Sequence, residues 1–201
     1  QVTNMRRMFY DAENFNDNIN DWDVSNVTVM GNLFTGALNF NQPLDNWDVS
    51  NATTMALMFN GAESFNQNIN NWNVSNVTEM WWMFKGAVNF NQPLNNWDVS
   101  NVQEIDGMFN SASSFNQPLD NWDVTSVGSF GFVDMFRDAS SFNQSLSNWE
   151  FPTGWLSGIF NNSGISTENY DILIEKLESL NIQNGTLGAE NIEYCDAFTR
   201  Q

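Results

Sequence analysis

The sequence predicts an α/β solenoid in which near-identical coils of 25 residues stack along one axis. Two observations carry this prediction: tryptophan recurs at a 25-residue step, and two columns of phenylalanine keep the same step until a two-residue insertion precedes the last member of each column. Such self-similarity is typical of stacked repeat proteins, because one repeat cannot bury its apolar face alone. The columns are Trp22, Trp47, Trp72, Trp97, Trp122 and Trp149; Phe9, Phe34, Phe59, Phe84, Phe109 and Phe136; and Phe15, Phe40, Phe65, Phe90, Phe115 and Phe142.

Each coil is expected to contain one short strand and one short helix. Leu44, Trp47 and Val49 have the LxxLxL spacing of a leucine-rich-repeat strand, in which alternate side chains face the core. The apolar residues from Ala52 to Ala62 follow in steps of three and four, which places them on one face of a short helix. We therefore predict a right-handed, leucine-rich-repeat-like array of about six coils over residues 1–165.

A different element is expected after the array. Capping chemistry is offered by Ser166, Thr167, Glu168 and Asn169, and the apolar residues that follow have helical spacing. Because the terminal coil of a repeat protein needs a cap, residues 166–201 are predicted to form a C-terminal capping segment with one helix. The helix positions are Tyr170, Leu173, Leu177 and Leu180, and the last stretch carries turn signals at Asn184, Gly185 and Gly188 and strand residues at Ile192 and Tyr194.

Charge and composition disfavour several classes of function. The chain has 24 acidic and 6 basic residues, which gives a formal net charge of −18. It therefore offers few cationic side chains to bind the phosphates of nucleic acids or anionic lipid headgroups. We expect no nucleic-acid partner and no membrane insertion. The chain has no histidine, which excludes Ser-His and Cys-His nucleophile systems. Repeated carboxylates in equivalent surroundings do not acquire the separate pKa values of an acid and a base, so we do not expect an enzyme.

The candidate ligand-binding residues are Trp81, Trp82 and Lys85, because they stand where the repeat varies. The preceding coil has Ala56 and Leu57 at the two tryptophan positions. At least one of two adjacent side chains must point away from the core, and an exposed tryptophan is suited to stack on a sugar ring or to anchor a protein. Lys85 would add a hydrogen-bond donor one turn later. The alternative is that both rings pack against a segment or neighbouring chain.

An acidic column follows the tryptophan column and offers a candidate metal site. Stacked carboxylates repel one another, and calcium bridging by Asp48, Asp98 and Asp123 would offset that repulsion. The alternative is that each aspartate accepts hydrogen bonds from its own Val-Ser-Asn turn. Apart from calcium, no cofactor is expected.

The repeat resembles that of a known family. The residues FNQPLDNWDVSNATTMALMFNGA, Phe40 to Ala62, are similar to the BspA-like leucine-rich-repeat surface proteins of bacteria, whose repeat is also called DUF285 or the mycoplasma lipoprotein repeat. The resemblance implies secretion or anchoring at the cell surface, as part of a larger multidomain chain, and roles in adhesion or recognition. It carries no catalytic residues.

Three functions follow as expectations. The first is an extracellular or cell-surface recognition and adhesion module that binds a protein or glycan polymer. The second is a passive structural spacer of a large surface protein, stiffened by calcium if calcium binds. The third is ice binding by a flat repeat face, for which Thr28, Thr53 and Thr78 begin a regular grid that Gln103 and Gly128 break.

Overall fold

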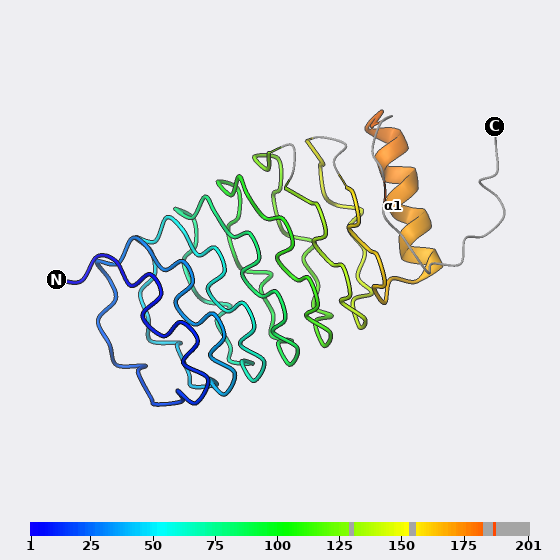
Figure 1. The fold of residues 1–201 in the computed structure, drawn as a ribbon. Coiled ribbons are helices and arrows are strands. Elements are labelled where there is room, and N and C mark those ends of the chain that lie inside the picture. Colours follow the sequence, from blue (N-terminus) through cyan, green and yellow to red (C-terminus); the bar gives the residue numbers. More distant parts are fainter. Residues whose placement is uncertain (129–130, 153–155, 183–186, 188–201) are drawn as a thin grey trace.

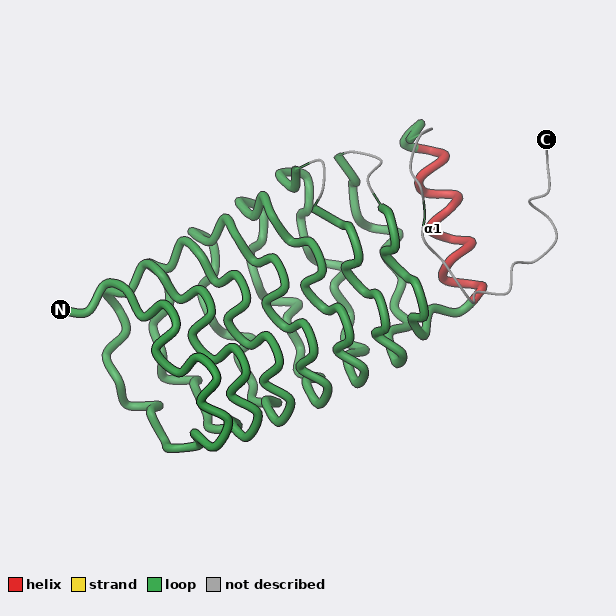
Figure 2. The backbone as a smooth tube through the Cα atoms, in the orientation of Figure 1, coloured by secondary structure: helices red, strands yellow, loops and turns green. Residues whose placement is uncertain are grey.

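The computed structural model describes residues 1–128, 131–152, 156–182 and 187. In these residues the chain forms a stack of coils, and the one helix or strand present is helix α1, Thr167–Ser179. Figures 1 and 2 show the coils side by side from the N-terminus to α1, which lies against the last coil. The predicted tandem array and its C-terminal helix are therefore confirmed. The turn and strand signals predicted at 184–185, 188, 192 and 194 lie outside the described residues.

The strand and the helix predicted within each coil are wrong. No β-strand occurs in the described ranges, where pairing is limited to isolated parallel bridges, so the sheet of a leucine-rich-repeat solenoid is missing there. The segment from Leu44 to Val49 turns instead, because the Trp47 N–H donates to the Leu44 carbonyl at 3.2 Å. All three predicted side chains are nevertheless buried, so a series of turns satisfies the same inward-facing pattern. The bridges join Asn4, Val29, Thr54, Glu79 and Glu104 in succession.

The segment predicted as a helix is a run of consecutive turns that also joins the coils. The N–H groups of Met58, Asn60 and Ala62 donate three residues back within the coil, at 3.1 to 3.2 Å. The alternate N–H groups, including those of Met55 and Phe59, donate to carbonyls of the next coil at 2.7 to 3.0 Å. An α-helix would use these N–H groups for bonds within the segment. Because half of the N–H groups in this segment donate to the next coil, the segment joins two coils instead of forming an α-helix.

Two residues in each run of turns have left-handed backbone, four positions apart. In the coil that contains Phe59 they are Leu57, with φ 60°, and Gly61, with φ 68°. Their N–H groups donate to carbonyls of the next coil. Glycine adopts this conformation freely, whereas it costs other residues roughly 1–2 kcal/mol. The two columns are Arg7, Asn32, Leu57, Trp82, Gly107, Asp134 and Gly158; and Asp11, Gly36, Gly61, Gly86, Ser111, Asp138 and Asn162.

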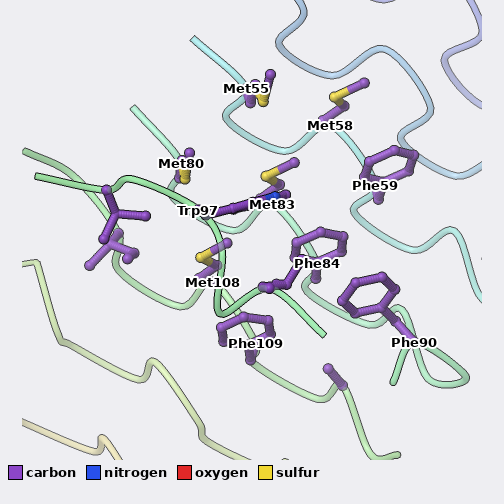
Figure 3. Close-up of a cluster of buried hydrophobic side chains, with 14 of the residues drawn as sticks. Met55, Met58, Phe59, Met80, Met83, Phe84, Phe90, Trp97, Met108 and Phe109 are labelled. Atoms are coloured by element: carbon purple, nitrogen blue, oxygen red, sulfur yellow. The ribbon is translucent and has the colours of Figure 1, made fainter. Parts of the chain in front are cut away.

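The core consists of side-chain stacks that run the length of the array. Phe59, Phe84 and Phe109 lie parallel, with ring centroids 5.6 and 5.7 Å apart, and methionines from the same coils line up beside them (Figure 3). Trp72 and Trp97 stack likewise at 6.5 Å. All of these rings are buried. The tryptophan and phenylalanine columns predicted from the repeat therefore form one continuous core from the second coil onward, whereas in the first coil Trp22 is exposed and Phe9 and Phe15 are partly buried.

Polar side chains run through the stack in parallel with the aromatic ones. Each buried indole N–H donates to a carbonyl of the preceding coil, as Trp97 Nε1 does to the Ile69 carbonyl at 3.0 Å. An asparagine column accepts hydrogen bonds from the coil that follows: Asn91 Oδ1 accepts from the Asn116 N–H at 2.9 Å and from Gln117 Nε2 at 3.0 Å. These asparagines therefore satisfy turn backbone from coil to coil.

Helix α1 closes the array by reproducing the contacts of a further coil. In the stack, Asn116 Oδ1 accepts from the Asn143 N–H at 2.9 Å and from Gln144 Nε2 at 2.8 Å. Asn143 Oδ1 in turn accepts from the Ser166 N–H at 2.8 Å and from Asn169 Nδ2 at 2.9 Å. The start of α1 therefore continues the asparagine ladder. Its apolar face is buried on the core through Tyr170, Leu173 and Leu177.

Candidate ligand-contact site

The tryptophan pair lies outside the aromatic core. Trp82 is 38% exposed and Trp81 is half-buried, and their rings meet edge to face at 6.1 Å. Lys85 Nζ lies 3.9 Å from the centroid of the Trp82 ring, a cation–π contact. Within the described part of the chain, neither indole N–H donates a hydrogen bond. The prediction that at least one of the two tryptophans points away from the core is confirmed by Trp82, and the structure brings the three residues together.

Trp82 shares the left-handed backbone of its column. Its φ of 55° places a bulky residue in the left-handed region, which favours glycine. The equivalent residue of the next coil is Gly107, and any side chain there would collide with the Trp82 ring. The ring thus extends over a neighbour with no side chain.

A cavity of about 100 Å³ lies beside Trp81. Arg6, Gly31, Ala56 and Trp81 all line it and occupy one repeat position in four successive coils. Gly31 and Ala56 are small, so the cavity lies over them, and the long side chains of Arg6 and Trp81 flank it. Trp81 therefore belongs both to the lining of this cavity and to the tryptophan pair.

Sequence reasoning missed Asn32, which also lines the cavity. It is 7% exposed and is the one buried polar residue in the described part of the chain. Asparagine is frequent in every coil, so nothing in the sequence singled out this one.

The three candidate calcium ligands accept hydrogen bonds from their own turns. Asp98 Oδ1 accepts from the Ser100 N–H at 3.1 Å and from its hydroxyl at 2.6 Å, and Asp48 and Asp123 make equivalent bonds. The Ser50 side chain and N–H lower the pKa of Asp48. Over the ranges that the structure describes, no three acidic, histidine or cysteine side chains gather as a metal site. The geometry favours the turn alternative, and calcium binding stays a prediction.

The threonine column behaves in the same way. The Thr53 hydroxyl donates to the Thr28 carbonyl at 3.1 Å, and Thr28 and Thr78 make the equivalent bond. These hydroxyl protons therefore bond to the protein rather than extend toward solvent. Nothing in this arrangement favours an ice-binding face.

One carboxylate opposes folding at neutral pH. Burial raises the pKa of Asp106 above its ordinary value of 3.8, and the nearby Glu104 and Asp134 add to the shift. A raised folded-state pKa means that the folded protein binds the proton more tightly than the unfolded chain does. Stability is therefore lost as pH rises from the unfolded pKa through the folded pKa.

We expect Asp106→Asn to raise the melting temperature at neutral pH, with a gain that shrinks below about pH 4, where the carboxyl is protonated in both states. Thermal denaturation across pH measures this. Asp48→Asn is the control, because its carboxylate is stabilised by its turn and its replacement should give no gain. An equal gain from both variants would contradict the assignment to Asp106.

The fold and its ladders define a class: a tandem-repeat solenoid built from consecutive turns, with stacked rings inside and asparagine ladders between coils. The chain belongs to the family described as Mycoplasma protein of unknown function, DUF285, which matches residues 1–87 and 67–170. No curated protein and no solved structure matches the chain. At 13 residues α1 is too short to span a bilayer, and no other helix occurs in the described residues.

Proposed function

We propose that this chain is a non-catalytic recognition and adhesion module, extracellular or at the cell surface, that binds a protein or glycan polymer. The observation that carries the proposal is the tryptophan pair: Trp82 is 38% exposed, Trp81 is half-buried, and both rings lie outside the core. Trp81, Trp82 and Lys85 form the contact surface. Aromatic side chains with free N–H groups are the residues that dominate binding to proteins and stack on sugar rings.

The strong negative charge narrows the choice of partner. With a formal charge of −18, the surface repels polyanions, so neutral or cationic polymers are favoured. The resemblance to bacterial surface proteins supports the same location and role.

A passive spacer is the second candidate. The hydrogen-bonded ladders run from coil to coil with nearly constant geometry, which suits a stiff rod that projects other domains. The spacer hypothesis gives the tryptophan pair no role, and this difference separates the two functions.

We expect the double variant Trp81→Ala/Trp82→Leu to fold normally and to bind its ligand about thirtyfold more weakly, equivalent to about 2 kcal/mol. It should fold because Ala56 and Leu57 occupy these positions in the preceding coil, where the backbone is also left-handed. Glycan arrays and pull-downs from surface-protein extracts, followed by titration of each hit, provide the measurement. Leu57→Gly is the control, since it changes the same column outside the pair and should leave binding unchanged. Retained binding by the double variant would contradict this contact surface, and no binding by the parent protein would favour the spacer.

A further inference from the structure

The cavity beside Trp81 contains the buried side-chain amide of Asn32, which has no hydrogen-bond partner among the described residues. The Asn32 N–H donates to the Ala56 carbonyl at 2.9 Å, and the Asn32 carbonyl accepts from the Thr35 N–H, so its backbone is satisfied. Its side-chain carboxamide makes no hydrogen bond to any described residue. Buried polar side chains almost always have a partner, and an unpaired one costs free energy. Asn32 shares the left-handed backbone of its column, with φ 59°. The buried amide, which has no partner among the described residues, is therefore available to a ligand.

The amide restricts the chemistry of that ligand. Its Oδ1 accepts and its Nδ2 donates, and a hydroxyl group can satisfy both needs with one oxygen atom. Glu79 and Thr54, which also line the cavity, add a carboxylate acceptor and a second hydroxyl. Trp81 supplies an aromatic surface for the C–H face of a sugar ring. The lining therefore combines an apolar platform with groups that bind hydroxyls.

Charged ligands fit less well. A guanidinium or ammonium group only donates, so it would leave the Asn32 N–H groups unpaired, and Arg6 at the cavity would repel it. An anionic sugar would meet Glu79 and the strongly negative protein.

We propose that this cavity is a subsite for one hexopyranose unit of a neutral glycan, with Asn32 as the hydroxyl-binding residue and Trp81 as the stacking platform. The proposal rests on the recognition function above and names the ligand class of the same surface. A longer glycan would continue from this subsite onto Trp82. Binding is expected to be insensitive to salt, because neither partner loses a net charge interaction.

The test uses the whole chain and four neutral tetrasaccharide probes: β-1,3-glucan, β-1,4-glucan, α-1,4-glucan and β-1,4-mannan. Binding is followed by calorimetry and by the NMR signals of the Asn32 side-chain amide. We expect at least one probe to shift these signals and to bind equally at low and high salt. Asn32→Gly should weaken that binding about tenfold or more, because the amide is lost. It should also keep or raise the melting temperature, since glycine fits a left-handed position.

Leu57→Gly is the matched control, because it relieves the same backbone conformation one coil later and does not line the cavity. It should raise the melting temperature and leave binding unchanged.

Four results would overturn the subsite. The first is that no tetrasaccharide binds or shifts the Asn32 signals, and the second is that Asn32→Gly binds with unchanged affinity. The third is a lowered melting temperature of Asn32→Gly, which would assign the amide to a structural water. The fourth is salt-sensitive binding of a lysine-rich or arginine-rich peptide in place of the sugars. If binding falls in Trp81→Ala/Trp82→Leu but not in Asn32→Gly, the recognition surface stands and the subsite alone is wrong. If no glycan or protein binds the parent chain, both proposals fail.

Discussion

Replacing Phe84 with alanine is expected to lower the free energy of unfolding by about 3–5 kcal/mol. The Phe84 ring is buried and stacks between two members of its own column, Phe59 at 5.6 Å and Phe109 at 5.7 Å. It also stacks on Phe90 of its own coil at 4.1 Å. Its loss therefore leaves a cavity with coils on both sides. Urea denaturation followed by circular dichroism and by tryptophan fluorescence measures the effect.

Phe9→Ala is the matched control for this prediction. Phe9 belongs to the same column but is only half-buried, and within its column it stacks on Phe34 alone, at 5.5 Å. We expect a clearly smaller loss of stability. Equal losses at the two positions would show that packing between coils on both sides is not what holds the array.

Replacing Asn91 with leucine is expected to cost about 2–4 kcal/mol, although the side chain is polar and its replacement apolar. Asn91 Oδ1 accepts two hydrogen bonds from the next coil, from the Asn116 N–H and from Gln117 Nε2. Leucine removes this acceptor: the part-buried Asn116 N–H is left unpaired, and Gln117 Nε2 keeps only its bond to the backbone carbonyl of residue 91, at 3.2 Å. Thermal and urea denaturation at neutral pH test the prediction.

The variant Asn91→Asp tests whether the accepting oxygen of residue 91 is what stabilises the array. Aspartate keeps an oxygen for both bonds, and the Asn91 Nδ2 group makes no hydrogen bond in the described structure that would be lost. We expect a much smaller effect than with leucine. If the two variants are equally destabilised, the ladder does not act through its accepting oxygen.

Much of the core was predictable because the same side chain recurs in the same place in every coil. Trp97 and Phe84 face inward as their columns predicted. The backbone between them was not predictable from that pattern. Leu44, Trp47 and Val49 would point inward from a strand or from a series of turns, and the two conformations differ in where the N–H groups donate. In the run of turns that follows, alternate N–H groups such as those of Met55 and Phe59 donate to the next coil, which lies outside any local pattern.

The residues of the candidate site also differ in whether the sequence alone could identify them. Trp81 and Trp82 could be singled out because they interrupt a regular column, and the structure places both outside the core. Asn32 could not, because it is one asparagine among many. Its significance comes from burial, from an unpaired amide and from the small side chains of Gly31 and Ala56, which leave space beside it.

The sequence by itself determined that the chain is a stack of 25-residue coils with shared aromatic columns, since identical units repeat identical burial. The tertiary structure alone decided that each coil is a run of turns without strand or helix, and that Asn32 and Trp81 share a cavity. The physical reason is that both outcomes depend on groups of adjacent coils, whose hydrogen bonds and open spaces exist only once the coils are stacked.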